Sequence, residues 1–183
     1  MSVSLILAIG PKGLIGYKNG LAWHSKKDFE FFKSHTINKP CIFGSTTFYG
    51  LPQYPLKQRL NIVLDNTQEK DVTGDNRGWV TCDSLENAIL FSENFNEVFI
   101  CGGKSVYEYA LKYDFVDRVY LTKISSDKLN KMVECSIEDL VFFNVENYIK
   151  DWHRWDLSED EEFDSLGNRM IINFNIYSKK PFV

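Results

Sequence analysis

Strand-like and helix-like segments alternate along the chain. Apolar runs of strand length occur at residues 3–9, 41–44, 60–64, 98–101 and 116–124. Between them, helices are predicted at residues 25–36, where Ser25 can act as the N-cap, and at residues 84–91 and 105–112. Residues 11–23 have no helical period and contain three glycines, so we expect a long loop, which in a compact domain is often functional.

The end of the chain has a different pattern. Residues 152–157 and 169–177 alternate well enough to form the two strands of a terminal hairpin. An acidic run separates them, and we expect it to form a solvated turn: Glu159, Asp160, Glu161, Glu162 and Asp164. Residues 125–150 are ambiguous, and we predict no element there.

Alternating strands and helices predict the fold class. We expect an α/β protein with a single domain over residues 1–183, in which helices flank a central, mostly parallel, twisted sheet and an antiparallel C-terminal hairpin closes it. Sites in such sheets lie at the carboxyl ends of the strands. That rule directs attention to residues 10–24, residues 44–47, residue 65 onward and residues 101–105.

Composition narrows the function classes. The 183 residues, 44% apolar and 15% aromatic, fit a globular domain. A formal charge of −4 gives no electrostatic footprint for nucleic acid or an anionic membrane. No apolar run approaches the length of a membrane span, and no secretory signal is visible, so we expect a cytoplasmic protein.

The cysteines and histidines do not have the spacing of a metal site. Cys41, Cys82, Cys101 and Cys135 form no CxxC pair, and only three histidines are present. Because Cys41 and Cys101 lie inside apolar runs, we interpret them as buried reduced thiols, which favours a reducing compartment.

Asp28 is the first candidate for chemistry. It lies four residues before Phe32, so a carboxylate and a phenyl ring share one helix face. This pair suits a flat heterocycle, because the acid accepts two parallel hydrogen bonds while the ring covers the π-face. Ser25 and Asp28 also have the spacing of a capping box, in which Asp28 would only close the helix end. Both interpretations stay open at this stage.

Two strand-to-helix junctions contain small residues. Gly102 and Gly103 precede Lys104 and Ser105, and such glycines let backbone N–H groups approach a pyrophosphate, although a tight turn explains them as well. Residues 44–47 (Gly-Ser-Thr-Thr) form a similar junction, where simple N-caps are the alternative. Two junctions in one sheet suggest an extended phosphate-bearing ligand, but the Rossmann fingerprint is absent.

Arg59 is the last candidate. An arginine suits bidentate capture of a carboxylate. A single arginine in a loop is also commonly a solvated surface charge, and the residue alone does not separate the two.

Taken in order, these pieces resemble the dihydrofolate reductase family. The resemblance covers residues 3–124, about two thirds of the chain, and the last strand. The matching blocks are Ser4-Leu5-Ile6-Leu7-Ala8, Ile15-Gly16, Asn19-Gly20-Leu21-Ala22-Trp23, residues 28–32, Asn38-Lys39-Pro40, residues 44–47, Pro55-Leu56, residues 59–64, Gly102-Gly103, Val106-Tyr107 and Tyr120-Leu121-Thr122-Lys123-Ile124. Each block is moderately specific, and their joint order is highly specific.

The resemblance implies an activity and the residues that perform it. The enzyme would transfer hydride from NADPH to C6 of 7,8-dihydrofolate, giving tetrahydrofolate for one-carbon metabolism and thymidylate synthesis, and would bind antifolates such as methotrexate. Asp28, bonded to Thr122, would hold the pterin and favour protonation at N5, while Leu21 and Trp23 of a mobile loop, residues 16–23, would complete the catalytic set. The implied substrate contacts are Ile6, Leu7, Ala8, Asp28, Phe29, Phe32, Leu51, Arg59 (for the glutamate α-carboxylate), Cys101, Tyr107 and Thr122.

The resemblance also implies a cofactor site with a cis bond between Gly102 and Gly103. The implied NADPH contacts are Ala8, Ile15, Gly16, Asn19, Gly20, Leu21, Gly44, Ser45, Thr46, Thr47, Leu64, Asp65, Asn66, Cys101, Gly102, Gly103, Lys104, Ser105, Val106 and Tyr107.

The chain departs from the family pattern at a few positions. Ser45 stands where the family usually has a basic residue for the 2′-phosphate, and Asp65-Asn66 follows the strand where serine and a basic or polar residue are usual. A carboxylate there repels a phosphate but can accept from a ribose hydroxyl, so use of NADH is not excluded; Lys104 or Arg77 are alternative sources of positive charge. Ala22 replaces the usual proline, and residues 125–143 lack the usual motif.

Two alternatives remain from the sequence. One is a related pyridine-nucleotide reductase of another heterocycle, such as a riboflavin-pathway type. The other is a catalytically silent binding or assembly module with the same fold. A monomer without a metal, nucleic-acid or membrane partner is expected in each case.

Overall fold

Parallel strands built from the buried apolar runs form the first of two units into which the chain divides. The computed structural model describes residues 1–18, 20–65 and 78–181. One unit comprises Met1–Ile6 with Lys33–Asp117, and the other comprises Leu7–Phe32 with Arg118–Val183. β1 (Ser2–Ile9) and α1 (Lys26–Thr36) therefore each contribute residues to both units.

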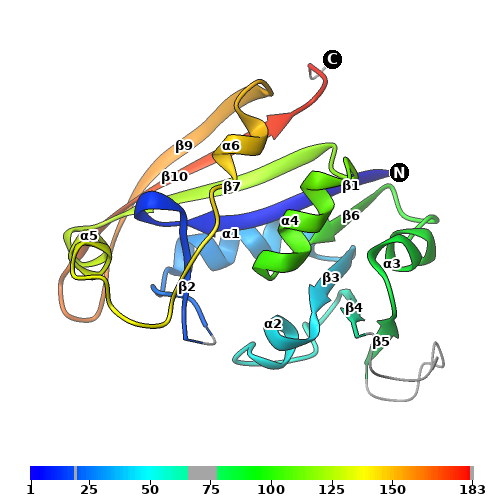
Figure 1. Ribbon diagram of the computed structural model, residues 1–183, viewed down its shortest axis with the longest axis horizontal. Coiled ribbons are helices and arrows are strands. Elements are labelled where there is room, and N and C mark those ends of the chain that lie inside the picture. Colours follow the sequence, from blue (N-terminus) through cyan, green and yellow to red (C-terminus); the bar gives the residue numbers. More distant parts are fainter. Residues whose placement is uncertain (19, 66–77, 182–183) are drawn as a thin grey trace. The chain divides into compact units, whose positions relative to one another are not determined.

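In the first unit, a parallel sheet has the strand order β5-β4-β3-β6-β1. Its register places Ile42 opposite both Ile62 and Ile100, and all three are fully buried, as expected for parallel strands covered on both faces. The strands are β3 (Pro40–Gly44), β4 (Leu60–Leu64), β5 (Trp79–Cys82) and β6 (Glu97–Ile100). The helices that follow β3, β5 and β6, in cyan to green in Figure 1, are α2 (Ser45–Tyr49), α3 (Leu85–Phe91) and α4 (Lys104–Lys112).

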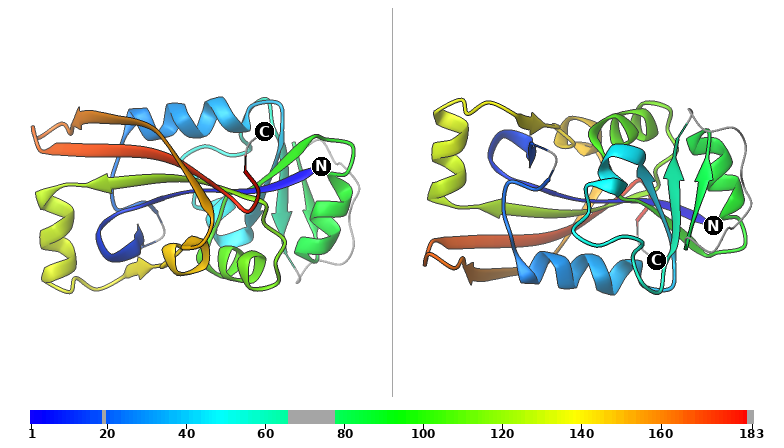
Figure 2. Two further views of the ribbon diagram at one scale, coloured as in Figure 1. Left: turned by 90° about the horizontal axis from the view of Figure 1, so that it is seen from above. Right: turned by 90° about the horizontal axis from the view of Figure 1, so that it is seen from below.

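In the second unit, three long strands pair antiparallel in the order β7-β10-β9 and lie side by side in both views of Figure 2. Their bounds are β7 (Arg118–Ser125), β9 (His153–Phe163) and β10 (Arg169–Ser178). A separate short ribbon pairs β2 (Leu14–Tyr17) with β8 (Leu140–Phe142). The remaining helices are α5 (Asp127–Glu134) and α6 (Glu146–Ile149).

An apolar cluster holds the second unit together. Phe31 of α1 stacks on Phe174 of β10 with ring centroids 4.5 Å apart, which packs this face of the helix onto the strands. The buried members of the cluster are Leu14, Trp23, Ile124, Leu129, Met170, Ile172 and Phe174. Asp28 lies one turn before Phe31, at i and i+3, so its carboxyl is on the side of α1 that adjoins this cluster, next to Trp23.

The predicted fold class is confirmed. The parallel sheet, its helices and the antiparallel C-terminal hairpin are all present. β4 has the predicted bounds, and the other predicted strands and helices agree within a few residues, except at the hairpin. All four cysteines are free thiols, three of them buried and Cys135 exposed.

Two predictions about loops are wrong. Residues 11–23 are not a continuous loop, because a one-turn helix at Pro11–Gly13 is followed by β2, which pairs with β8. Four of the five acids in the run are not in a turn, since β9 continues to Phe163; the turn begins at the fifth, Asp164, and ends at residue 168. Asp160 bonds to Lys27 and Glu162 bonds to Ser25, both at the start of α1. Because these bonds hold the acids in place, the strand continues through charged residues.

Several elements were not predicted. β5 is only four residues long, and α5, β8 and α6 fall in the ambiguous stretch. No helix in the described part of the chain is long and apolar enough to cross a bilayer.

Candidate active site

The predicted site residues fall into two groups, one in each unit. In the first unit, the carboxyl ends of β4, β3 and β6 are adjacent. Gly44 pairs with Leu64, and the Gly44 N–H donates to the Gly102 carbonyl oxygen at 2.7 Å. The two strand-to-helix junctions that the sequence analysis singled out therefore meet at one sheet edge.

The paired glycines lie directly against Thr47. The Gly102–Gly103 bond is cis, as the resemblance predicts. A Cβ on Gly103 would lie 2.6 Å from Thr47 Oγ1, and one on Gly102, where φ is +134°, would lie 3.1 Å from Thr47 Cγ2. Side chains are therefore excluded at both positions, and bare backbone lines this spot.

Both helices at this edge begin without a side-chain cap. Their N-caps are Gly44 for α2 and Gly103 for α4, which have no side chain to offer. The alternative of simple caps by Ser45 or Thr46 is wrong, because both residues lie inside the first turn of α2. The first backbone N–H groups of α4, which has nine residues, are available to an anion.

Buried residues support this edge from beneath. The Tyr107 hydroxyl donates to the Ile6 carbonyl oxygen at 3.0 Å, and Val106 packs against Gly44. Burial, together with the neighbouring Cys41 thiol, raises the pKa of the Cys101 thiol well above its usual value. Cys101 is therefore a protonated packing residue.

The remaining predicted residues of the first unit lie at both ends of the strands. Arg59 directly precedes β4, at the end opposite the paired glycines, whereas Leu51 follows α2 and Asp65 follows β4. Arg59 donates from Nη1 to the Lys57 carbonyl oxygen at 2.6 Å and from Nε to Thr36 Oγ1 at 3.3 Å. Leu51 is half-buried just after α2. The Asp65 N–H donates to the Cys82 carbonyl oxygen at 2.9 Å, at the end of β4.

A positive charge near this edge already has an ion-pair partner. Lys104 in the first turn of α4 makes a 3.7 Å ion pair with Glu108, and Ser105 beside it is exposed. Asn66 and Arg77 lie outside the described residues, as does Asn19 of the other group.

In the second unit, Asp28 is a buried carboxyl, 9% exposed. Burial raises its pKa from the ordinary 3.8 to about 6, against a hydrogen bond from Thr122 and the nearby Trp23 indole, both of which lower it. The negative charge of Glu162 raises the pKa further. A carboxyl with a pKa near 6 exchanges its proton close to neutral pH, as a general acid requires.

The two interpretations of Asp28 can now be separated. Ser25 is the N-cap of α1, since its Oγ accepts from the Asp28 N–H at 3.1 Å and its carbonyl accepts from the Phe29 N–H at 3.2 Å. The Asp28 carboxylate does not complete the capping box but bonds to Thr122 of β7. The carboxyl of Asp28 is therefore not used to cap α1.

Trp23 has an unusual indole. Its ring belongs to the apolar cluster, and its N–H favours the ionised form of Asp28 without reaching the geometry of a hydrogen bond. Within the described part of the chain, Trp23 Nε1 is a buried side-chain nitrogen that has no hydrogen-bond partner. A buried donor in this state is suited to a ligand group or water beside Asp28.

The other predicted residues of this unit are spread more widely. Ala8 packs against the apolar cluster that contains Trp23, and Leu7 is buried. Phe32 is half-buried on the Asp28 face of α1, whereas Phe29 is 40% exposed and contacts the His24 ring. Of the glycine-rich segment, Ile15 and Gly16 lie in β2, Gly16 close to the Gly20 carbonyl, and Leu21 is exposed.

Glu162 is a residue that the sequence analysis missed as part of the site. Its carboxylate accepts from the Ser25 hydroxyl at 2.6 Å, directly at the cap of the helix that carries Asp28. The local sequence gives no signal for this role, because residues 159–162 are four consecutive acids.

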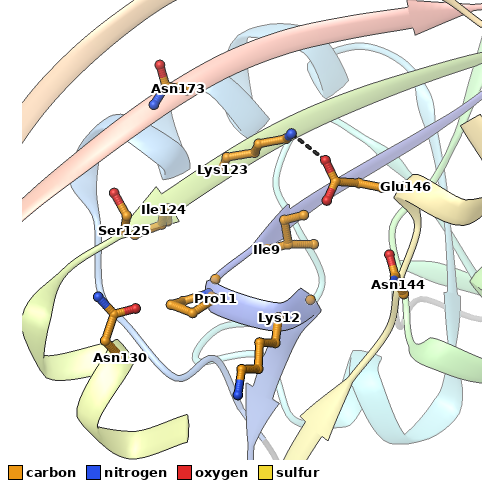
Figure 3. A pocket seen from close by; sticks show the side chains of 12 residues that line it. Ile9, Pro11, Lys12, Lys123, Ile124, Ser125, Asn130, Asn144, Glu146 and Asn173 are labelled. Carbon is orange, nitrogen blue, oxygen red and sulfur yellow. Dashed lines mark hydrogen bonds and ion pairs between the residues drawn. The ribbon is translucent and has the colours of Figure 1, made fainter. Parts of the chain in front are cut away.

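A hollow of about 420 Å³ in the second unit lies elsewhere (Figure 3). Lys123, Ile124 and Ser125 of β7 line it together with residues 9–13, and neither Asp28 nor Thr122 belongs to its lining. Lys123 is paired there with Glu146. None of the predicted site residues lines this hollow.

Comparison with known proteins gives a consistent result. The sequence profile of the family described as dihydrofolate reductase matches residues 2–179. The dihydrofolate reductase of Buchnera aphidicola subsp. Acyrthosiphon pisum is 37% identical over 127 residues, which cover 69% of this chain and 74% of the relative. That of Haemophilus influenzae is 30% identical over 161 residues, 88% of each chain.

A solved structure shows the same fold. It is dihydrofolate reductase from Enterococcus faecalis complexed with NADP(H) and RAB-propyl, with a TM-score of 0.73 and 22% identity. The match covers 98% of this chain and 97% of that one.

The raised pKa of Asp28 predicts a pH-dependent stability difference. Because the folded state holds this proton more tightly than the unfolded state, Asp28 stabilises the fold most below about pH 4, and this contribution is lost as the pH rises through about 6. Between pH 4 and 7, Asp28→Asn should therefore gain on the order of 3 kcal/mol in free energy of unfolding relative to wild type. Urea unfolding at each pH measures this, with exposed Asp127→Asn as the control; parallel curves for wild type and Asp28→Asn would contradict it.

Proposed function

This chain belongs to the dihydrofolate reductase family, and from that premise we propose that it reduces 7,8-dihydrofolate to 5,6,7,8-tetrahydrofolate with NADPH. The observation that carries the proposal is the buried Asp28 carboxyl, with its pKa of about 6, beside Thr122 and Trp23. The reaction would supply tetrahydrofolate for one-carbon metabolism and thymidylate synthesis.

Asp28 performs two tasks in this proposal. Its two oxygens accept hydrogen bonds from N3 and the 2-amino group of the pterin, a matched pair of donors. A proton that the carboxyl gives up near neutral pH can pass to N5, and the negative charge left on Asp28 favours the pterin that is protonated there and therefore electrophilic at C6. Bound NADPH supplies the hydride that adds to C6, and with the proton at N5 the products are tetrahydrofolate and NADP⁺.

The neighbours of Asp28 prepare it for these tasks. Thr122 fixes the carboxylate through its hydrogen bond, and the unpartnered indole N–H of Trp23 is a donor for a group bound beside it. Leu21 is exposed in the segment before Trp23, and in the proposal it would exclude water from the bound ring as that segment closes.

The rest of the substrate would contact apolar and cationic residues. Phe32 and Phe29 on α1, with Leu7 and Ala8, offer apolar surface in one unit, and Ile6, Leu51, Cys101 and Tyr107 offer it in the other. Arg59 would hold the glutamate α-carboxylate, since its guanidinium is already oriented by Thr36 and the Lys57 carbonyl.

The residues at the sheet edge of the first unit fit a dinucleotide. The backbone at Gly44, Gly102 and Gly103 is bare, a Cβ would fill the space at Thr47, and α4 begins with available N–H groups. Phosphate oxygens would be held there with the hydroxyls of Thr46, Thr47 and Ser105. The further cofactor contacts proposed are Ala8, Ile15, Gly16, Asn19, Gly20, Leu21, Ser45, Leu64, Asp65, Asn66, Cys101, Lys104, Val106 and Tyr107.

We further propose that residues 1–183 act as a single domain, that the protein is a cytoplasmic monomer, and that antifolates such as methotrexate bind the Asp28 site. These proposals rest on family membership.

Asp28→Asn tests the catalytic role. The variant should fold but lose about 10²–10⁴-fold in kcat/KM at pH 7, because the proton-donating group is gone, with a smaller loss in acid where the pterin is protonated from solvent. Absorbance at 340 nm with dihydrofolate and NADPH measures this, and Asp127→Asn is the matched control. Turnover near the wild-type rate at pH 7 would refute the role.

The cofactor preference generates a separate prediction. Ser45 begins α2 at the place where the family usually has a basic residue, so Ser45→Arg should raise kcat/KM for NADPH roughly tenfold through a charge-assisted hydrogen bond to the 2′-phosphate. The value for NADH should not change, and uncharged Ser45→Gln is the control. Equal changes for both cofactors would show that Ser45 does not face this phosphate.

A further inference from the structure

The first turn of α1 is capped by a side chain from a distant strand. Glu162 of β9 accepts from the Ser25 hydroxyl at 2.6 Å, from the Lys26 N–H at 2.9 Å and from the Lys27 N–H at 3.4 Å. These backbone donors are among the four that a helix leaves unsatisfied at its start. A negative charge at this position is also stabilised by the positive, N-terminal end of the helix dipole.

The contact reaches Asp28 through Ser25. The Ser25 hydroxyl donates to Glu162 and its oxygen accepts from the Asp28 N–H, so one hydroxyl links the two acidic residues. Ser25 is fully buried at 1% exposure. Glu162 is 137 residues away in sequence, and the β9–β10 hairpin therefore sets where the first turn of α1 begins.

Glu162 also acts on Asp28 by charge. Burial opposes ionisation of Glu162, but the hydrogen bonds from Ser25, Lys26 and Lys27 outweigh it, so its pKa lies below the usual value. Glu162 is therefore already negative where Asp28 titrates, and its charge raises the pKa of Asp28.

Other polar and charged groups near Asp28 and Glu162 also affect the pKa values of these two carboxyls. Around Asp28 they are Thr122 from β7 and Trp23. Around Glu162 they are His24, which favours its ionised form, and the exposed ion pair of Lys27 with Asp160 at 2.7 Å. On β10, Glu162 is opposite the apolar Met170.

We propose that Glu162 is a positioning residue for Asp28: from the β9–β10 hairpin its carboxylate caps the first turn of α1 through Ser25 and the Lys26 and Lys27 amides, and places a negative charge close to Asp28. This inference rests on the proposed function for its catalytic meaning. The structural part stands on the described contacts alone.

The test separates charge from hydrogen bonding. Glu162→Gln keeps an acceptor for Ser25 and the backbone but removes the charge, whereas Glu162→Ala removes both. Glu161→Gln is the matched control, because Glu161 is the neighbouring acid on β9 and bonds outward to Arg169 at 2.6 Å.

The first readout needs no substrate. The ¹³C shift of the Asp28 side-chain carboxyl is followed against pH by NMR, in the wild-type and in the His24→Gln background. We expect a midpoint lower by roughly half a pH unit in Glu162→Gln, and no change in Glu161→Gln. An unchanged midpoint in Glu162→Gln would overturn the electrostatic part.

The second readout is the cap itself. In Glu162→Ala the amides of Lys26 and Lys27 should exchange with deuterium faster than in wild type, and Glu162→Gln should restore much of their protection. Exchange at the wild-type rate in Glu162→Ala would overturn the positioning part.

The third readout joins the inference to catalysis. If the pKa of Asp28 is lower by half a unit in Glu162→Gln, kcat/KM of this variant should fall about threefold at pH 7 and remain near wild type at pH 5. An equal loss at both pH values would show a merely structural role. If wild type itself lacks reductase activity while the NMR midpoint still shifts, the proposed function fails and the role of Glu162 in positioning Asp28 stands.

Discussion

The removal of the Asp28 carboxyl from water underlies the chemistry proposed for this protein. A carboxylate in water is ionised at neutral pH and has no proton to offer. Beside the apolar cluster that contains Trp23, the charged form is disfavoured, while the hydrogen bond from Thr122 restores part of its stability. The balance leaves a pKa of about 6, which suits the two tasks proposed for this carboxyl, holding N–H donors and favouring a proton on the bound ring.

The other unit depends on a different constraint, the absence of side chains. Gly102 and Gly103 press so closely on Thr47 that any larger residue would displace it, and Gly44 is bonded to the same backbone. Bare backbone beside the start of α4 is what an anionic phosphate group can approach. One site is therefore built by desolvating a charge, and the other by leaving polar backbone accessible.

The local sequence was sufficient to predict an element where the residues of that segment alone determine its structure. β4 has the predicted bounds because its apolar run is buried whatever its neighbours are, and the shared helix face of Asp28 and Phe32 follows from their spacing. Glu162 could not be found this way, because its meaning depends on Ser25, which is brought to it only by the tertiary fold. Likewise β2 exists because β8 pairs with it, and neither strand has a strong pattern of its own.

The pH dependence of wild-type turnover reports on whether the proton of Asp28 controls the reaction. With dihydrofolate and NADPH followed at 340 nm, we expect kcat/KM to be level below about pH 6 and to fall towards tenfold per unit above it, as the Asp28 carboxyl loses its proton. A value that stays constant from pH 5 to pH 8 would contradict the assignment of this buried carboxyl as the source of proton control.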